Sequence, residues 1–272
     1  MNPPTDTLAF IGGGNMASAL VGGLRKLGRP GSSILVIEPG HDQRQRLQAE
    51  FGVRTLAAAD EQLAQASCVV WAVKPQMFSL AATRCAAHVA GALQLSVMAG
   101  IRSQAIARAT GSARIVRSMP NTPALIGRGI AGLFATPLVT ASERLQIEQL
   151  LAPTGQTLWV AREAELDAVT ALSGSGPAYV FYFIEAMVAA AVEMGLTAEQ
   201  GQRLALATFD GATALAVQSS ESPATLRERV TSKGGTTHAA LQSLESSGVK
   251  AAFVQALKAA QQRARELGDE FG

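Results

Sequence analysis

The stretch FIGGGNMASAL (residues 10–20) decides the fold, because it places three glycines between an apolar strand and the start of a helix. Gly12, Gly14 and Ala17 follow the pattern G-x-G-x-x-A, which is typical of dinucleotide-binding folds. Gly12 permits the tight turn, Gly14 lets the backbone approach a pyrophosphate, and the small Ala17 lets helix and strand pack closely. The alternative is a tight strand–helix turn that binds nothing. The candidate cofactor-binding residues of this turn are Gly12, Gly14, Asn15, Met16 and Ala17.

Short apolar runs alternate with amphipathic segments up to about residue 160. This rhythm of strand, helix and strand predicts an α/β domain with a doubly wound parallel sheet of the Rossmann type. A helix is expected over residues 142–151, between two further strands at the edge of the sheet. The predicted strands are residues 7–12, 34–38, 68–73, 93–98 and 114–119, with edge strands at 129–137 and 156–161.

The predicted secondary structure changes near residue 163, where the strands end and Ala-rich helices follow. We therefore predict two domains: residues 1–162, which bind a dinucleotide, and residues 163–272, which are all helical. The helices are expected at residues 164–172, 177–194, 197–218, 223–231 and 237–269, the last divided near Ser246.

Composition argues against several classes of protein. The chain of 272 residues has a formal charge of +2, and no run of Lys or Arg exceeds two residues, so a nucleic-acid partner is not expected. The apolar stretch 178–196 contains Glu185 and Glu193, which favours burial in a domain or subunit interface over a membrane span. We expect no signal peptide and a cytoplasmic protein. Cys68 and Cys85 match no metal-ligand spacing, so no metal is expected.

Glu38 ends the second predicted strand, where an acidic side chain normally accepts a hydrogen bond from the ribose 2′-hydroxyl and repels a 2′-phosphate. This position favours NADH. His41, Arg44 and Arg46 follow closely, however, and any of them could reach a phosphate, so the choice between NADPH and NADH stays open. The alternative is that Glu38 is an exposed loop carboxylate.

Two further loops follow predicted strands. AVKPQ (72–76) contributes Val73, Lys74 and Pro75 as candidate cofactor-binding residues, although Lys74 could be an ordinary solvated lysine. In SMPNTPAL (118–125), two prolines bracket Asn121, which could hold a nicotinamide or a substrate. Its alternative is an Asx-type turn that leaves a strand.

Five motifs in order, GGGNMASAL, AVKPQ, MPNTP, SGSGPAYVF (173–181) and PATLRERVTSKGGTTHAAL (223–241), carry a resemblance over essentially the whole chain. The chain resembles the pyrroline-5-carboxylate reductases. The resemblance implies reduction of 1-pyrroline-5-carboxylate to proline by NADPH or NADH, the last step of proline biosynthesis. It also implies a helical domain that interlocks with a second subunit in a homodimer, which some members assemble into a decamer. One position departs from the family, since Lys233 stands where a proline is usual.

The SKGGTT turn (232–237) is suited to a small cyclic imine with a carboxylate. Backbone N–H groups at this turn could form an anion-binding nest at the start of the following helix, and Thr237 would offer its hydroxyl to the ring nitrogen. That is also the role that the resemblance implies for Thr237. His238 is rejected as a general acid, since Thr237 occupies the matching family position. The candidate substrate-binding residues are Ser232, Gly234, Gly235, Thr236 and, as a wall of the pocket, Ser175.

Two rival functions remain at the level of sequence. Another imine or ketone reductase of the same architecture would need a lysine on a helix in the middle of the chain, and helix 177–194 has none. A regulatory protein that binds NAD(P) without turnover would be expected to lose the substrate motif, and here its elements are present.

Overall fold

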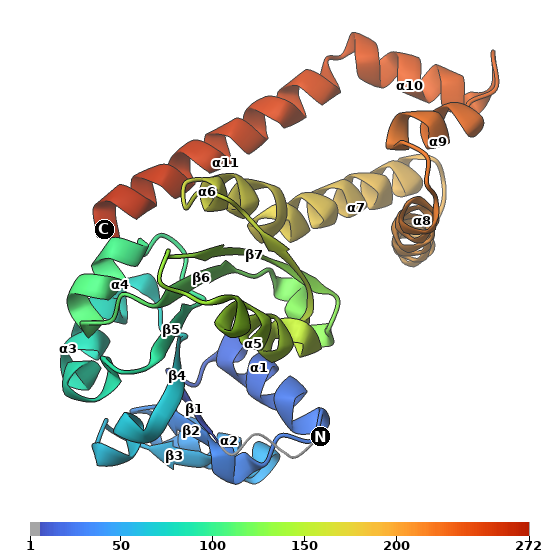
Figure 1. The fold of residues 1–272 in the computed structure, drawn as a ribbon. Helices are drawn as coiled ribbons and strands as arrows, with labels where there is room; N and C mark the ends of the chain where they lie inside the picture. Colours follow the sequence, from blue (N-terminus) through green and yellow to red (C-terminus); the bar gives the residue numbers. More distant parts are fainter. Residues whose placement is uncertain (1–5, 272) are drawn as a thin grey trace. The chain divides into compact units, whose positions relative to one another are not determined.

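The computed structural model describes residues 6–271, and its N-terminal part contains an eight-stranded sheet (Figure 1). The strand order is β3-β2-β1-β4-β5-β6-β7-β8, and all neighbours are parallel except β6 and β7. The strands are β1 (Thr7–Ile11), β2 (Ile34–Ile37), β3 (Arg54–Leu56), β4 (Ala66–Trp71), β5 (Leu93–Ser96), β6 (Ile115–Met119), β7 (Gly129–Ala135) and β8 (Gly155–Trp159).

Helices cover both faces of this sheet, because successive strand residues point to opposite sides. In β1, Leu8 and Phe10 pack toward α1 (Asn15–Lys26), α2 (His41–Phe51) and α5 (Ala141–Leu151). Ala9 and Ile11 pack toward α3 (Phe78–Val89) and α4 (Ser103–Thr110). The prediction of a doubly wound Rossmann-type sheet is therefore confirmed.

The sequence did not predict β3, a strand of three residues at the edge of the sheet. Arg54 and Thr55 are polar, so with Leu56 they form no apolar run, and all three are half-buried. A run of three residues is also too short to show a period of two. Its place next to β2 matters for the site, because the segment that follows β3 lines a cavity there.

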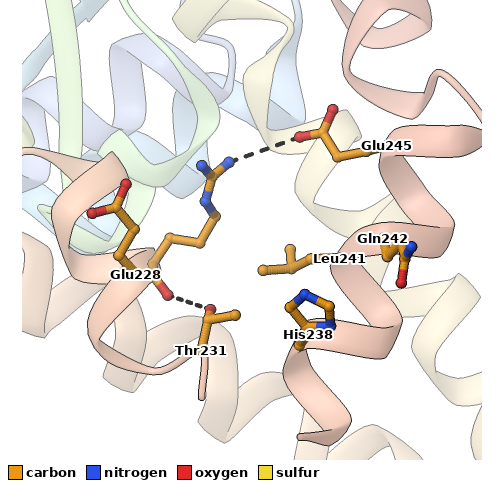
Figure 2. A pocket seen from close by; sticks show the side chains of 7 residues that line it. Glu228, Thr231, His238, Leu241, Gln242 and Glu245 are labelled. Atoms are coloured by element: carbon orange, nitrogen blue, oxygen red, sulfur yellow. Dashed lines mark hydrogen bonds and ion pairs between the residues drawn. The ribbon is translucent and has the colours of Figure 1, made fainter. Parts of the chain in front are cut away.

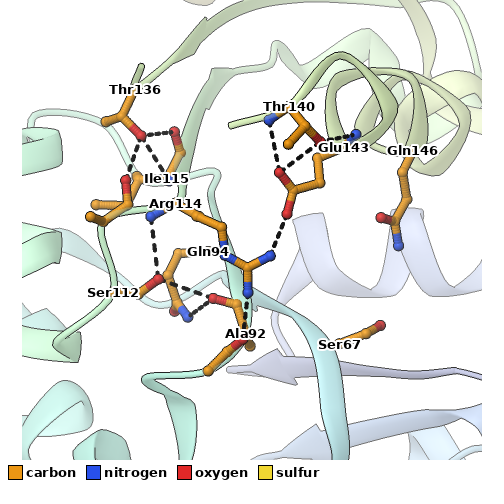
Figure 3. A network of polar contacts seen from close by, with 12 residues as sticks. Ser67, Ala92, Gln94, Ser112, Arg114, Ile115, Thr136, Thr140, Glu143 and Gln146 are labelled. Carbon is orange, nitrogen blue, oxygen red and sulfur yellow. Dashed lines mark hydrogen bonds and ion pairs between the residues drawn. The ribbon is translucent and has the colours of Figure 1, made fainter. Parts of the chain in front are cut away.

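Helix α5 is attached to the sheet by a polar network that centres on Arg114 (Figure 3). Its guanidinium pairs with Glu143, which closes a capping box with Thr140 at the start of α5. Burial alone would raise the pKa of Glu143, but hydrogen bonds from Thr140 and the charge of Arg114 outweigh burial and lower it. The Oγ of Ser112 donates to the carbonyl of Ala92 and so connects the starts of β5 and β6.

The remaining elements are helical, as predicted. They are α6 (Glu165–Val169), a π-helical turn (Thr170–Gly174), α7 (Gly176–Glu193), α8 (Ala198–Gln218), α9 (Pro223–Arg229), α10 (Thr236–Ser246) and α11 (Val249–Phe271). Helices α7 and α8 pack along each other. Gly201 of α8 has no side chain, which lets Ala191 of α7 pack closely against the backbone of α8. Tyr179 and Phe183 of α7 make edge-to-face contacts with Phe253 of α11.

Packing divides the chain into two compact units. One contains the residues up to Ser175 together with those from Ala260 onward, and the other is Gly176–Ala259. Residues 163–175 join the sheet unit because Val169 of α6 packs over Gly132 in β7. Near the end of the chain, Leu267 of α11 packs against Gly100. The predicted division at 162/163 follows the change from strands to helices and stays a prediction about sequence domains.

Helix α7 exposes much of its apolar surface. Phe181 is 59% exposed and Tyr182 is 69% exposed. By length and composition alone, the helical stretch Glu165–Glu193 could cross a membrane, with a mean hydropathy of 1.4 and only 6% of its most apolar window buried. Such a helix presents a face that some other apolar surface must cover in water.

Candidate active site

The glycine turn after β1 has the shape needed to accept a diphosphate. Gly12 has φ of +96°, and a Cβ there would lie 2.8 Å from the carbonyl oxygen of Ala72, so the loop after β4 packs directly on the turn. Gly14 is the N-cap of α1, no side chain caps this helix, and the space beside the Gly14 α-carbon is open. The first N–H groups of α1 therefore point to a free space where an anion would be stabilised. The residues present fit a dinucleotide.

Glu38 is held in place at the carboxyl end of β2. Its Oε2 accepts a hydrogen bond from the N–H of Gly13 at 2.8 Å, and its Oε1 accepts one from the N–H of Gly40, also at 2.8 Å. Both oxygens are thus fixed by backbone, and the carboxylate is not a freely moving loop side chain.

A cavity of about 410 Å³ brings five of the predicted cofactor residues together. These are Gly12, Gly14, Glu38, Val73 and Lys74. The cavity wall also contains residues that were not predicted from the sequence, only some of them because β3 was not predicted. They are Ala57, Ala58 and Ala59 after that strand, with Met77, Leu80, Ala81, Arg84 and Cys85 around helix α3.

Four of the other predicted cofactor residues lie around this cavity rather than in its wall. Asn15 is exposed at the first turn of α1, and Met16 packs against the core. Ala17 is fully buried, which is the close helix–strand packing expected of it. Pro75 starts the short 3-10 helix Pro75–Met77.

Trp71 fixes the start of the loop that carries Val73 and Lys74. It is the last residue of β4 and is fully buried. Its indole N–H donates to Oε1 of Gln94 at 2.8 Å, and its ring packs edge-to-face on Phe78 with centroids 5.3 Å apart. A fixed Trp71 holds the end of β4, and hence the start of the loop, in one position.

Asn121 has a structural task in this fold. Its Oδ1 accepts a hydrogen bond at 3.0 Å from the N–H of Ile130, which ties the loop after β6 to β7. The predicted contact of Asn121 with the cofactor stays a prediction.

A π-helical turn, Thr170–Gly174, ends within the SGSG segment (173–176), and such turns are frequent at functional sites. A Cβ on Gly174 would lie 2.6 Å from Cε of Met119, so the turn lies against the carboxyl end of β6. Ser175 follows directly and closes the turn through its N–H to the carbonyl of Thr170, at 2.8 Å. Ser175 therefore belongs to the sheet unit and lies close to the MPNTP loop.

The SKGGTT segment forms a tight turn at the start of α10. The N–H of Gly235 donates to the carbonyl of Ser232 at 3.0 Å, and Gly234 has φ of +75°, as a type II turn requires. Gly235 is the N-cap of α10, and no side chain caps the helix. Thr236 and Thr237 are its first two residues. The turn brings Ser232, Gly234, Gly235, Thr236 and Thr237 together in the helical unit.

His238 points away from this turn, into a shallow cavity of about 290 Å³ between α9 and α10 (Figure 2). Arg227 and Glu245 form an ion pair across that cavity at 3.9 Å. Successive residues of a helix project about 100° apart. The direction of His238 thus differs from that of Thr237, and the rejection of His238 as the acid stays a prediction.

Within residues 6–271 there is no cluster of three or more His, Cys, Asp or Glu side chains suited to a metal. The two thiols are free and buried. Burial raises the pKa of Cys85 to about 11, so this residue of the cavity wall is a neutral thiol near pH 7.

Comparisons with known proteins agree with this architecture. Residues 163–267 match the family described as pyrroline-5-carboxylate reductase dimerisation, and residues 7–100 match NADP oxidoreductase coenzyme F420-dependent. Pyrroline-5-carboxylate reductase of Pseudomonas aeruginosa is 44% identical over 98% of this chain and 99% of its own length. The chain belongs to the pyrroline-5-carboxylate reductase family. It is accordingly an oxidoreductase, and the dimerisation region indicates that it forms oligomers.

Solved structures give the same result. A pyrroline-5-carboxylate reductase from Coxiella burnetii superposes with a TM-score of 0.91 at 37% identity, covering 97% of this chain and 99% of that one. The Plasmodium falciparum pyrroline carboxylate reductase with NADP bound superposes with a TM-score of 0.86 at 26% identity, covering 98% and 100% of the two chains. The resemblance and the two-part fold predicted from sequence are confirmed.

Proposed function

We propose that the protein reduces 1-pyrroline-5-carboxylate to L-proline with NADPH or NADH, as the last step of proline biosynthesis. The observation that supports this reaction is the turn at Gly234, which leaves the N-terminus of α10 uncapped beside two threonines. The full-length similarity to reductases of this name supports it as well.

The sheet unit is proposed to hold the cofactor. The diphosphate would lie at the start of α1, over Gly12, Gly14 and Asn15, with Met16 and Ala17 supporting the turn. Glu38 would meet the adenosine ribose, and Val73, Lys74 and Pro75 would border the opposite wall, with Asn121 nearer the nicotinamide. When bound, the cofactor supplies the hydride.

The helical unit is proposed to hold the substrate. The carboxylate would accept hydrogen bonds from backbone N–H groups around Gly234, Gly235 and Thr236, with the Ser232 hydroxyl beside them and Ser175 as a wall. These dipoles favour an anion without a charged side chain.

Thr237 is the proposed catalytic residue. Its hydroxyl would hydrogen-bond the ring nitrogen and so fix the imine carbon for hydride attack. It would also support the positive charge of the protonated imine nitrogen, so that hydride addition to the carbon gives the amine with the proton that the nitrogen already carries. The chain itself thus contributes placement and a polar environment rather than a strong acid.

We also propose that the exposed face of α7 is covered by a second copy, giving a homodimer in the cytoplasm, from which a decamer can assemble as in some members of the family. No nucleic-acid or membrane partner is proposed. The small net charge supports the expectation of no nucleic-acid partner, and the match to the dimerisation family supports the homodimer.

The test is the consumption of NADPH and NADH with pyrroline-5-carboxylate as substrate. Thr237→Ala should lower kcat at least about tenfold, as expected for loss of one positioned hydrogen bond, with little change in cofactor affinity. Thr236→Ala is the matched control, because only the backbone of Thr236 is assigned a role, and it should stay near the activity of the original chain.

Unchanged turnover in Thr237→Ala would remove Thr237 from the mechanism. Absence of substrate-dependent oxidation with either cofactor, from protein that binds nucleotide, would favour the other reductases or a regulatory role.

A further inference from the structure

The environment of Glu38 distinguishes between the two nicotinamide cofactors. Its carboxylate stands at the end of β2 in the wall of the cofactor cavity, with both oxygens held by the N–H groups of Gly13 and Gly40. Each bound oxygen keeps a further lone pair for another donor. A ribose hydroxyl is such a donor, whereas a 2′-phosphate brings only acceptors and about two negative charges.

The cationic side chains that follow Glu38 have partners of their own, among them Arg46, whose Nε lies 3.5 Å from Oε2 of Glu50. Arg44 donates through Nη1 to the carbonyl oxygens of Glu38, at 2.8 Å, and of Pro39, at 2.7 Å, so its guanidinium is drawn to backbone. His41 is largely exposed and its Nδ1 lies 3.4 Å from Asp42. Gln43 donates to the carbonyl of Gly13.

The two cations that do line the cavity come from its other side. Lys74 follows β4 and Arg84 lies on α3. Strand β4 is two strands away from β2 in the sheet, which is roughly 10 Å at the usual spacing between strands. Lys74 and Arg84 can attract the negatively charged cofactor. They lie on the side of the cavity away from Glu38, however, and so are not placed to pair with a 2′-phosphate on a ribose bound there.

We propose that Glu38 makes NADH the preferred cofactor of this chain, by binding the ribose hydroxyls and repelling the 2′-phosphate of NADPH. The proposal rests on the proposed use of a nicotinamide cofactor but not on the identity of the imine. It assigns this chain a preference that differs from the NADP bound in the Plasmodium falciparum structure.

The test is calorimetric titration of the full chain with NADH and with NADPH, in the absence of substrate. We expect the original chain to bind NADH at least about fivefold more tightly than NADPH. Glu38→Ser should weaken NADH and strengthen NADPH, and shift the ratio of the two Kd values by about tenfold or more, as expected for loss of a charge beside a phosphate.

Asp42→Asn is the matched control. It removes a fully exposed carboxylate from the same segment and should leave the ratio of Kd values within about twofold. If Glu38→Ser fails to fold, Glu38→Gln keeps one oxygen for a glycine N–H, removes the charge, and should shift the ratio in the same direction.

Two results would overturn the proposal: equal or tighter binding of NADPH by the original chain, or an equal loss for both cofactors in the Glu38 variants. Preferred binding of NADH without turnover of pyrroline-5-carboxylate would instead overturn the proposed reaction and leave this preference standing.

Discussion

Glu163 and Arg117 form an ion pair, with 2.8 Å between Oε1 and Nη1, although they are 46 positions apart in the chain. Glu163 also accepts hydrogen bonds from the N–H and the hydroxyl of Ser103, at 2.6 and 2.7 Å. Arg102, the residue before Ser103, and Asp167, four positions after Glu163, make a bidentate pair at 3.1 Å. The start of the predicted helical domain is therefore bound to β6 and α4 by buried charges.

Removing the charge of Glu163 should destabilise the sheet unit. Glu163→Gln leaves the buried guanidinium of Arg117 without its counter-charge, which costs roughly 3 kcal/mol for such a pair. The measurement is urea unfolding at pH 7. Glu165→Gln is the control, because Glu165 pairs with Arg162 at an exposed site and should have little effect. Equal stability of the Glu163 variant and the original chain would contradict the role of this pair.

The same pair predicts a dependence on pH. Burial raises the pKa of Glu163, but Ser103 and Arg117 outweigh burial, so the net pKa lies below its usual value. A carboxyl with a lowered pKa in the folded state stabilises above the unfolded pKa, near 4.5, and this contribution is lost as pH falls through the folded pKa. The stability gap between the original chain and Glu163→Gln should thus narrow below about pH 4.5. A constant gap down to pH 3 would contradict it.

Lys233→Pro should stabilise the turn before α10. Position 233 is the second residue of a type II turn, where proline is favoured, and a compatible proline adds about 0.4–1 kcal/mol by restricting the unfolded chain. Lys233→Ala is the control, because it removes the cation without restricting the backbone. It should not stabilise the folded protein. Thermal unfolding measures both, and a lower Tm for the proline variant would mean that the backbone at 233 differs from a type II turn.

Neither thiol should react in the folded protein at pH 8. Burial raises the pKa of Cys68 to about 12 and that of Cys85 to about 11, and the thiolate is the reactive form. Labelling with a disulfide reagent should be complete only in denaturant. Since Cys85 lines the cavity that is proposed to hold the cofactor, any slow labelling of native protein at Cys85 should be suppressed by NADH. Fast labelling without denaturant would contradict the buried positions.

Phe181→Asp should weaken the oligomer. The side chain is 59% exposed on α7, inside the region that matches the dimerisation family, and a carboxylate in an apolar interface is costly. Sedimentation should show a shift to smaller species. Leu27→Asp is the control, since Leu27 is 69% exposed at the end of α1, outside that region. An unchanged assembly in Phe181→Asp would place the interface elsewhere.

Local patterns were sufficient to predict most of the fold. The apolar run around Phe10 and the glycines after it are encoded within a dozen residues, so β1, the turn and α1 could be read directly. The three residues of β3 carry no such pattern. The pairing of Glu163 with Arg117 depends on where the segment before α6 meets β6 in space, and no local sequence pattern encodes that meeting.

The candidate site shows the same division. Gly12, Gly14 and Glu38 were predicted from their spacing, and the structure places them in one cavity. The sequence could not predict which backbone N–H groups bind Glu38, or that the N–H of Ile130 binds Asn121. Every residue except proline has a backbone N–H group, so residue type does not indicate which of these groups will donate to a side chain.

The position of Trp71 gives the protein a built-in optical reporter. The chain has two tryptophans. Trp71 lies two residues before Val73, which is in the wall of the cavity that is proposed to hold the cofactor, while Trp159 lies on the edge strand β8 beside Arg144. Reduced nicotinamide absorbs where indole emits, so a bound cofactor should quench Trp71 by energy transfer. In Trp159→Phe, the remaining fluorescence would come from Trp71 alone and would follow the filling of the cavity without any added label.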